Sequence, residues 1–442
     1  MTASKDFRKY FSKKMLNKIY KDEIRYKSAR GVDRINNEAF EDQIKENIEI
    51  IHRKVHNGTY QFSQYREKLI SRGAGRTPRV ISIPTIRDKL TQKAITEILQ
   101  LSFGSQTPFL HKIINDVIQA YRSGLYQSVL RLDVKDFYPS IQHKLLLKEI
   151  SRKIKKKELL HLIGNAVSRK TVSKPSGKDK KLSTVGVPQG LSISNILANI
   201  YLLKIDKKYS NIPDIKYFRY VDDILIFCQT ANVDQIRVEI TNDCTTLGLN
   251  LHSDLDNPSK SSVTSTVDRF TYLGYQFENA KITVRRKSID SFRESIIRLL
   301  TNYKYSETQN IVFLKWALDL RITGCIFNKS KYGWLFFFSQ IDDVSLLGSL
   351  DHFVRSQLKR FNINDLKPKT FLKSYYEITR NLSKTTYIPN FDKFTVEKKH
   401  QILREVFQFP NPLMSTAEIE YHFRRKIYKT VRELEKDLSR PS

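Results

Sequence analysis

The sequence predicts an α+β fold, in which a small sheet of β-α-β-β-α-β order with insertions follows N-terminal helices and precedes a long helical region. Two observations predict this class. Short apolar or alternating runs indicate strands, with a segment of helical spacing at 232–247 among them; these runs are 127–132, 216–219, 224–227, 270–277 and 281–284. From about residue 288 the spacing is mostly helical.

The N-terminal region is predicted to be helical except for one hairpin. Residues 6–60 have helical spacing, interrupted by a turn at Arg30-Gly31-Val32-Asp33. Residues 66–84 alternate instead, around a glycine-rich basic tip at 71–76. That combination is typical of a β-hairpin.

Helical spacing returns at 85–103 and again at 141–168. A polar basic loop at 174–181 then precedes a helix that is expected to run through Tyr201. Near the C-terminus, the aromatic run 332–338 favours a buried core over a base-stacking surface.

Composition narrows the class of partner. The 442 residues are 40% hydrophobic, enough for two or three folded domains. The formal charge of +31 is spread along the whole chain, so phosphate backbones are the expected partner. No apolar run approaches the roughly 20 residues of a spanning helix, and the first residues lack an apolar signal region, so we expect a cytoplasmic protein without a membrane partner.

The three cysteines, Cys228, Cys244 and Cys325, are too few and too scattered for a disulfide framework or a Cys-x-x-Cys zinc site. We interpret them as core thiols. The nine histidines show no pair at ligand spacing with a third partner, so a histidine-metal nuclease module is not expected.

Three aspartates form the principal chemical motif. Asp222 and Asp223 are adjacent between two apolar runs, where a turn between strands would hold both. Crowded like charges need a compensating cation, and Mg²⁺ prefers oxygen ligands. Asp133 follows another strand-like run, and one acid on a strand with a pair on a nearby hairpin is the minimum set for two-metal phosphoryl transfer. For an isolated acid pair, a solvated turn is the alternative.

Five segments then follow one another in a fixed order across residues 25–290. They are Arg30-Gly31-Val32-Asp33, the block 79–89 from Arg79 to Lys89, the block 132–141 around Asp133, the block 186–201 that begins Gly186-Val187-Pro188-Gln189-Gly190, and Phe270-Thr271-Tyr272-Leu273-Gly274-Tyr275. In this order they resemble the reverse transcriptases, and specifically the bacterial lineage of group II intron, retron and phage-defence enzymes.

The resemblance implies a right-hand polymerase with fingers, a ferredoxin-like palm, and a mostly helical thumb and C-terminal domain. We expect N-terminal helices and fingers at 1–128, the palm at 129–287 with a fingers-type insertion near 141–184, and the thumb and C-terminal domain at 288–442. The implied activity is nucleotidyl transfer from dNTPs to a growing DNA 3′ end.

The resemblance makes Asp133, Asp222 and Asp223 the catalytic residues. Asp133 and Asp222 would bridge two Mg²⁺ ions, for which Mn²⁺ could substitute, while Asp223 and the Val134 carbonyl would complete or support the metal site. One ion would lower the pKa of the primer 3′-hydroxyl, and the other would neutralise the triphosphate.

Nucleotide-binding residues follow from the same resemblance. Arg79, with Arg72 and Arg76 on the basic tip, would neutralise the incoming phosphates through forked donors, although a solvated loop is the alternative for the tip. The Gln189 amide would lie where the backbone approaches the nucleotide closely. Tyr138 stands where this family carries an aromatic residue that excludes a ribose 2′-hydroxyl, so we expect a preference for dNTPs.

Two further sites are implied. Lys260 ends the sequence Asn257-Pro258-Ser259-Lys260, which resembles the family's Asn-Pro-x-Lys, where a lysine could protonate pyrophosphate. A surface lysine is the alternative. Tyr272, Leu273 and Gly274 resemble the primer grip.

One departure favours a subclass. Asn195 stands where intron and many retron enzymes carry proline, a variant that resembles the abortive-infection and defence-associated reverse transcriptases. Residues 288–442 also show no Cys-x-x-Cys nuclease, acidic RNase H-like cluster or intron-type zinc module.

We therefore predict a reverse transcriptase that acts in bacterial antiphage defence. A retron- or intron-like enzyme dedicated to one structured RNA is the first alternative. An inactive nucleic-acid-binding assembly protein is the second, which the three retained acids disfavour. The expected partners are dNTPs, an RNA template or noncoding RNA, the DNA product, and a second copy of the chain or a partner defence protein.

Overall fold

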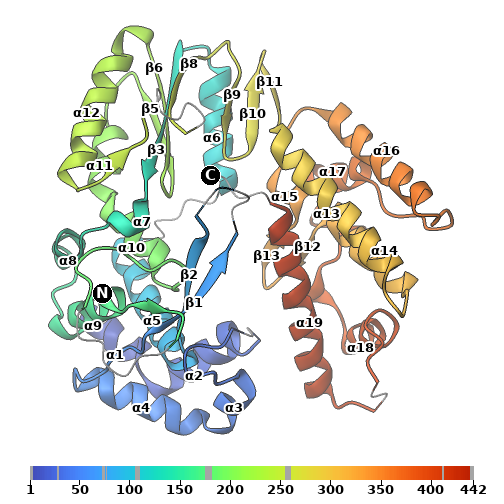
Figure 1. Cartoon of the computed structure of the whole chain (residues 1–442), viewed down its shortest axis with the longest axis horizontal. Coiled ribbons are helices and arrows are strands. Elements are labelled where there is room, and N and C mark those ends of the chain that lie inside the picture. Colours follow the sequence, from blue (N-terminus) through green and yellow to red (C-terminus); the bar gives the residue numbers. More distant parts are fainter. Residues whose placement is uncertain are drawn as a thin grey trace. The chain divides into compact units, whose positions relative to one another are not determined.

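The computed structural model describes residues 3–26, 29–71, 75, 77–104, 110–174, 182–253, 260–410 and 413–438. The chain forms two compact units, residues 1–264 and 265–442 (Figure 1). In the described part of the chain, no helix is both long and apolar enough to span a membrane. The predicted division at residues 128 and 287 stays a prediction.

Helices build the N-terminal part of the first unit, as predicted for residues 6–60 and 85–103. The elements are α1 (Ala3–Tyr10), α2 (Lys13–Ile19), the π-helix η1 (Tyr20–Ile24), α3 (Asn37–Asp42), α4 (Ile44–His56) and α5 (Ile86–Phe103). Side-chain caps begin several of them: Ser12 accepts from the Met15 amide, and Thr85 accepts from the Asp88 amide. Apolar side chains on α1, α2 and α4 pack with those of α5 into one core.

The predicted hairpin is present as β1 (Tyr65–Ile70) and β2 (Arg79–Ile83), which pair antiparallel. A short strand, β4 (Thr171–Val172), adds to β1 in parallel. Of the basic tip, Arg72 and Arg76 lie outside the described residues.

The second sheet of this unit has the order β5-β6-β3-β7. Its strands are β3 (Ser128–Lys135), β5 (Lys216–Tyr220), β6 (Asp223–Cys228) and β7 (Asn250–Leu251), all paired antiparallel, and β8 (Ser262–Ser265) also pairs with β3. With β3 counted as the first strand, this is the 2-3-1-4 order of a ferredoxin-like sheet. The predicted β-α-β-β-α-β order is therefore confirmed, but its last strand is β7 and not the segment 270–277 that was predicted for it.

Helices cover this sheet and fill the connection between β3 and β5. In chain order they are α6 (Leu110–Arg122), α7 (Phe137–Ser140), α8 (His143–Ser151), α9 (Lys157–Ser168), α10 (Ser194–Tyr201), α11 (Leu203–Tyr209), the 3-10 turn η2 (Thr230–Asn232) and α12 (Val233–Thr246). Ile236, Ile240 and Cys244 of α12 share a core with Leu130 and Leu132 of β3. Leucine-bearing positions of β3 therefore face α12, and the intervening positions face away from it.

The second unit begins with a three-stranded antiparallel sheet: β9 (Phe270–Tyr272), β10 (Tyr275–Glu278) and β11 (Lys281–Val284). The prediction of a single strand at 270–277 was wrong, because this segment forms two strands, β9 and β10, joined by a turn. Leu273 and Gly274 both have positive φ, 47° and 85°, and they turn the chain back on itself.

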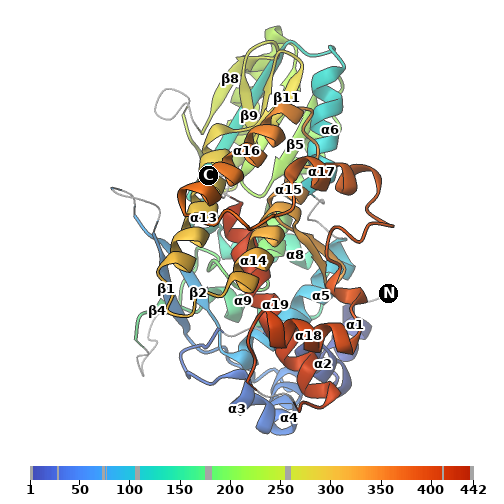
Figure 2. The same ribbon diagram turned by 90° about the vertical axis from the view of Figure 1, so that its right-hand side faces the viewer.

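The rest of the second unit is mostly helical, as predicted. Its elements are α13 (Arg286–Lys304), α14 (Ile311–Thr323), β12 (Cys325–Phe327), β13 (Ser330–Tyr332), α15 (Trp334–Phe337), α16 (Val344–Arg360), α17 (Phe371–Arg380), the 3-10 turn η3 (Phe391–Lys393), α18 (Val396–Glu405) and α19 (Thr416–Asp437). The hairpin β12–β13 is an addition that the helical pattern did not predict. Figure 2 shows α18 beside α19, which it contacts.

The aromatic run 332–338 is core, as the sequence favoured. Trp334 is buried and stacks on Phe292, with ring centroids 4.8 Å apart. Phe371 packs edge-on against Phe292 at 5.6 Å. A second cluster joins α14, α18 and α19 around Phe391 and Phe423.

All three cysteines are buried and unpaired, which agrees with their interpretation as core thiols. Burial raises the pKa of Cys228 to about 11 and that of Cys244 to about 12. It also raises the pKa of Cys325.

Gly324 is required by its backbone and by its neighbours. It follows α14 with φ 67° and ψ −166°, a region that only glycine adopts without strain. A Cβ at this position would lie 2.3 Å from the Tyr332 carbonyl oxygen and 2.7 Å from the Phe336 ring. By contrast, a Cβ at Gly348 in α16 would meet nothing within 4 Å.

The first prediction uses these two glycines as a matched pair. Gly324→Ala should lower the free energy of unfolding of the second unit by about 2–3 kcal/mol, because it adds both strain and overlap. Gly348→Ala should raise it by up to about 1 kcal/mol, since alanine favours a helix interior. Both tryptophans, Trp316 and Trp334, lie in this unit, so denaturation followed by tryptophan fluorescence reports on it. Equal unfolding midpoints for the two variants would contradict the conclusion that glycine is required at position 324.

Asp88 is a buried carboxyl in the first unit. It accepts from the Tyr60 hydroxyl over 2.9 Å and from the Ser63 amide over 3.1 Å. Burial raises its pKa from 3.8 to about 6, which outweighs these hydrogen bonds. In the folded chain it therefore stays protonated to a higher pH than in the unfolded chain.

The second prediction follows from that shift. Between about pH 4 and pH 6 the folded state holds a proton that the unfolded state has lost, so the stabilising contribution of Asp88 is present at pH 4 and lost as the pH rises to 6. The change is about 3 kcal/mol for a shift of two pKa units. Asp88→Asn should remove this dependence. Urea unfolding of both proteins at pH 4 and pH 6.5, followed by circular dichroism, measures the difference between their free energies of unfolding. The same difference at both pH values would contradict the prediction.

Candidate active site

The pairing of β3 with β6 brings together acids from distant segments. Asp133 of β3 stands opposite Asp223 of β6 in the ladder. The backbone amide of Val134 donates to the carbonyl of Asp222 over 3.3 Å. The three aspartates chosen from the sequence therefore meet at one end of this strand pair.

The turn that carries Asp222 is strained and anchored. Val221 and Asp222 are the two residues between β5 and β6, and Val221 has φ 59°. Two-residue hairpins need such positive φ values, but a β-branched residue rarely adopts them. Arg219 Nη1 donates to the Val221 carbonyl over 2.8 Å, and Arg219 Nε donates to Asp206 Oδ1 over 2.6 Å. Arg219 thus ties the turn to α11.

Asp223 is held by an arginine of the neighbouring strand. Arg131 Nε and Nη2 donate to its two carboxylate oxygens over 3.1 and 3.0 Å, a forked pair that is almost fully buried. Burial raises the pKa of Asp223, while the charge and hydrogen bonds of Arg131 oppose that rise. This carboxylate is therefore fixed in position by the protein itself.

The surroundings of Asp222 disfavour its ionised form. Burial raises its pKa to about 6, and the negative charge of Asp133, followed by that of Asp223, raises it as well. The positive charge of Lys260 lowers the pKa of Asp222. A second positive charge near Asp222 would therefore stabilise its ionised form.

Asp133 is buried among three residues from the segments after α12. Lys260 Nζ donates to both of its carboxylate oxygens over 3.3 and 3.2 Å. His252 Nε2 lies 3.6 Å from Oδ2, and the His252 amide donates to the Asp133 carbonyl over 3.0 Å. The Asp133 amide in turn donates to the Ser261 hydroxyl over 3.3 Å. Residues 254–259, which include Asn257 and Pro258 of the predicted motif, lie outside the described residues.

The donor set fits a divalent cation in charge and chemistry. Asp133 and Asp222 offer carboxylate oxygens, and burial together with the charge of Asp133 raises the pKa of Asp222. Among the described residues, no three Asp, Glu, His or Cys side chains are grouped as a formed metal site. Lys260 and Arg131 supply positive charge to two of the acids.

The predicted nucleotide-binding residues of the hairpin and of the 186–201 block also meet. Arg79 Nε donates to Gln189 Oε1 over 2.5 Å, and the Ser82 amide donates to the Gln189 carbonyl over 2.7 Å. Gly190 has φ 99°, and a Cβ there would lie 2.7 Å from the Ile81 side chain. Glycine thus lets this loop lie directly on β2.

Tyr138 is buried beside the acids. Its hydroxyl donates to Asn195 Oδ1 over 2.8 Å, and its carbonyl accepts from the Val187 amide over 2.8 Å. Burial raises the pKa of Tyr138 to about 12, with the charge of Asp222 adding to the rise and that of Arg79 opposing it. The hydroxyl is therefore protonated at neutral pH, as a donor must be.

The predicted primer-grip residues lie in the second unit. Tyr272 and Leu273 are buried there, and a Cβ at Gly274 would lie 3.2 Å from the Phe338 ring. In that unit Gly274 accepts from the Arg285 amide over 2.9 Å. These residues form a tight turn within their own sheet.

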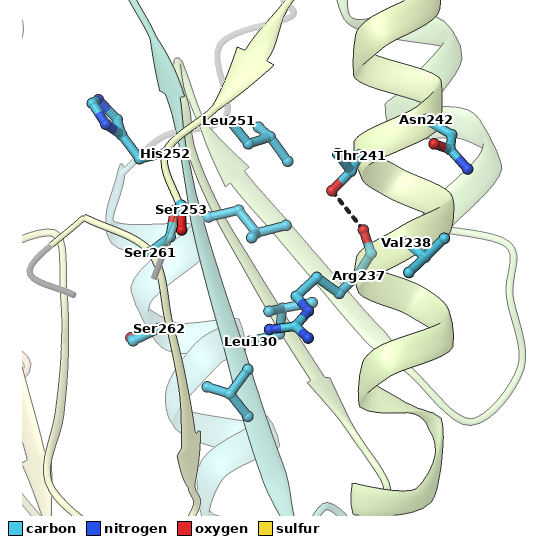
Figure 3. A pocket seen from close by; sticks show the side chains of 12 residues that line it. Leu130, Arg237, Val238, Thr241, Asn242, Leu251, His252, Ser253, Ser261 and Ser262 are labelled. Carbon is cyan, nitrogen blue, oxygen red and sulfur yellow. Dashed lines mark hydrogen bonds between the residues drawn. The ribbon is translucent and has the colours of Figure 1, made fainter. Parts of the chain in front are cut away.

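A groove of about 600 Å³ lies on the other side of β3 (Figure 3). It runs between α12 and the strands, with Leu130, Leu132 and Leu251 on one side and Val238 and Arg237 on the other. Because Leu130 and Leu132 alternate along β3 with Arg131 and Asp133, the carboxylate of Asp133 points away from this groove. It is therefore not the site that the acids would serve.

Sequence reasoning missed four residues of the acid cluster: Arg131, Arg219, His252 and Ser261. Arg131 could have been found, since it lies two positions before Asp133 and so shares a face of the strand with it. His252 and Ser261 carry no local signal, because Asp133 is brought close to them only by the fold. Arg219 contacts the nearby Val221 carbonyl, but its other partner, Asp206, is likewise brought close by the fold.

Comparison with known proteins finds one matching family model and several relatives. The family model described as "Reverse transcriptase (RNA-dependent DNA polymerase)" matches residues 72–277. The chain is 23% identical over 344 residues to protein YkfC of Escherichia coli, covering 66% of this chain and 85% of that protein. It is 28% identical over 187 residues to the group II intron-encoded protein LtrA of Lactococcus lactis, covering 37% of this chain but only 28% of that one.

Solved structures give weaker matches. Apo telomerase from Candida tropicalis aligns over 93% of this chain and 74% of its own, at 14% identity and a TM-score of 0.45. Telomerase from Candida albicans, in complex with a fragment of telomeric RNA, aligns over 93% and 71%, at 14% identity and a TM-score of 0.43. Residues 72–277 are therefore similar to the reverse transcriptase (RNA-dependent DNA polymerase) family, and the chain is similar to a group II intron-encoded protein over part of its length.

Proposed function

We propose that this protein synthesises DNA by a metal-assisted transfer in which Asp133 and Asp222 hold Mg²⁺. The observation that carries this is the β3–β6 register, which sets Asp133 opposite Asp223 and beside the turn bearing Asp222. The backbone carbonyl of Val134 is a further ligand in this proposal. Mg²⁺ would supply a Lewis acid that eases deprotonation of the primer hydroxyl and neutralises the triphosphate, and Mn²⁺ could replace it.

The protein's own groups have distinct tasks in this scheme. Arg131 holds Asp223 in place. Asp223 would support the metal site and add negative charge to it. Lys260 neutralises Asp133 when no metal is bound, and it is close enough to the acids to hand a proton to departing pyrophosphate. Because Lys260 is only 20% exposed, water does not readily replace it.

Recognition of the nucleotide is proposed for the joined hairpin and loop. Arg79 would bind the phosphates, and Gln189, its hydrogen-bond partner, would set the direction of the guanidinium. Tyr138 would close the sugar side of the site against a ribose 2′-hydroxyl. Arg72 and Arg76 are proposed to add phosphate contacts, and Tyr272, Leu273 and Gly274 to position the primer.

Nucleic acid is the proposed partner beyond the active site, and α19 offers a basic face for it. Lys429 and Arg432 are exposed there, and Lys426 lies 5.2 Å above the Phe407 ring. Burial lowers the pKa of Lys426, and the charges that lower it further, those of Lys429 and Arg425, are both positive. Such a cluster is stabilised by a polyanion. Alternating rings and cations suit a single strand.

For the biological role we propose antiphage defence, with residues 265–442 serving RNA or subunit contacts. Asn195 in place of proline and the absence of a Cys-x-x-Cys module in the sequence support this role. The similarity to LtrA favours a second candidate, an intron- or retron-like enzyme dedicated to one structured RNA. Sequencing RNA that co-purifies with the protein separates the two: one defined structured RNA supports the second candidate.

The third prediction tests the acids. Asp222→Ala should lower the rate of primer extension with dNTPs and Mg²⁺ by more than about 100-fold, because several kcal/mol of charge stabilisation are lost. Its unfolding midpoint at neutral pH should not fall, since the substitution removes a crowded charge. Binding of a primer-template should also persist.

Asp234→Ala is the matched control. Asp234 lies in the first turn of α12, and its side chain is 84% exposed, so the change should leave extension near the wild-type rate. If Asp222→Ala extended primers as fast as Asp234→Ala, the site assignment would be wrong.

The fourth prediction tests the basic face of α19. Replacing Lys426, Lys429 and Arg432 together by Gln should weaken binding of a single-stranded RNA and reduce the slope of log K against log salt by about 2, since each phosphate contact contributes roughly 0.7. The control replaces Lys45, Arg53 and Lys54 of α4, three exposed cations, by Gln. Fluorescence anisotropy over a salt series measures both, and identical slopes would rule out this face.

A further inference from the structure

The contact between Tyr138 and Asn195 joins the predicted sugar-discriminating ring to the residue that departs from the family pattern. The Tyr138 hydroxyl donates to Asn195 Oδ1 over 2.8 Å. The two residues are 57 positions apart, so the contact depends on the fold. It places the acceptor amide at the far end of the aromatic side chain.

The acceptor is itself held in place. Asn195 lies in the first turn of α10, and the residue before it, Ser194, donates from its hydroxyl to the Pro188 carbonyl over 2.6 Å. The Thr96 hydroxyl of α5 donates to the Ser192 carbonyl over 3.2 Å. The start of α10 is therefore fixed both to the loop before it and to α5.

The ring is held at both of its ends. At the backbone, the Tyr138 carbonyl accepts from the Val187 amide over 2.8 Å, and Phe137 packs beside the ring with centroids 5.6 Å apart. At the tip, the side chain at position 195 is the hydrogen-bond partner of the hydroxyl among the residues that the structure describes. Without it, the ring could tilt about χ1 and χ2.

Exclusion of one hydroxyl group depends on such small displacements. A side chain that rejects a substrate by overlap must keep its position to within about 0.5 Å, and neighbouring hydrogen bonds provide that rigidity. Proline at position 195 could not provide it, because it has no side-chain acceptor. Asn195 is exposed, so it contributes little to the core and is available for this task.

We propose that Asn195 is a positioning residue that sets the sugar selectivity of the nucleotide site by anchoring the Tyr138 hydroxyl. This rests on the proposed function, in which Tyr138 faces the sugar of the incoming nucleotide. The ratio of kcat/KM for a dNTP to that for the matching rNTP is the quantity that Asn195 controls.

The experiment is a double-mutant cycle on that ratio, with wild type, Asn195→Ala, Tyr138→Phe and the double variant. Tyr138→Phe keeps the ring and removes only the hydroxyl. Each single variant should lower the dNTP/rNTP ratio by about 5-fold, the effect expected of one lost hydrogen bond. The change should come mainly from a higher kcat/KM for the rNTP. The double variant should match either single variant, because both remove the same contact.

The outcomes separate the possible failures. No extension by wild type would overturn the proposed function and this inference with it. Extension by wild type, with an Asn195→Ala ratio equal to that of wild type, would overturn only the inference. Two effects that multiply in the double variant would also overturn it, since Asn195 would then act by a route other than Tyr138. Unfolding midpoints of all four proteins confirm that each is folded.

Discussion

The antiparallel register between β3 and β6 is the constraint on which the rest of the site depends. A shift of one residue would turn Asp133 toward α12 and Leu132 toward the acids, because side chains alternate along a strand. Apolar packing against α12 opposes such a shift, since Leu130, Leu132 and Val134 share its core. The hydrophobic packing that maintains the strand register therefore comes from the face of the sheet opposite to the carboxylates.

Three cationic side chains lie close to the acids, and each contacts a different group. Arg131 neutralises Asp223 within the sheet, Lys260 approaches Asp133 from the segment after α12, and Arg219 holds the backbone of the turn through Val221. Burial and the negative charge of Asp133 are the largest influences on the pKa of Asp222, and both raise it. The carboxylate with the least compensation is thus the one at the hairpin tip, where a cation would gain most.

Much of the fold could be predicted because its signals are local. Alternation at 66–84, helical spacing at 232–247 and the acid pair between two apolar runs each occupy one short segment. Three-residue strands such as Cys325–Phe327 and Ser330–Tyr332 are too short to show a period, so their hairpin was missed. The turn at Leu273 and Gly274 was missed because apolar residues continue on both sides of it.

The residues of the candidate site likewise differ in whether the sequence alone could show them. Asp133, Asp222, Gln189 and Tyr138 belong to recognisable segments, whereas the pairing of Tyr138 with Asn195 requires knowledge of which segments meet. Asn195 was noticed in the sequence only as a departure, and its physical meaning came from the fold. A family pattern states which residue is usual at a position but not what an unusual one contacts.

The burial of the three thiols has a practical consequence. Thiol reagents and peroxides react with the thiolate, and burial disfavours that form in Cys228, Cys244 and Cys325. The native protein should therefore resist alkylation and mild oxidation. A single cysteine introduced on the surface would then carry a spectroscopic probe without removal of the native ones.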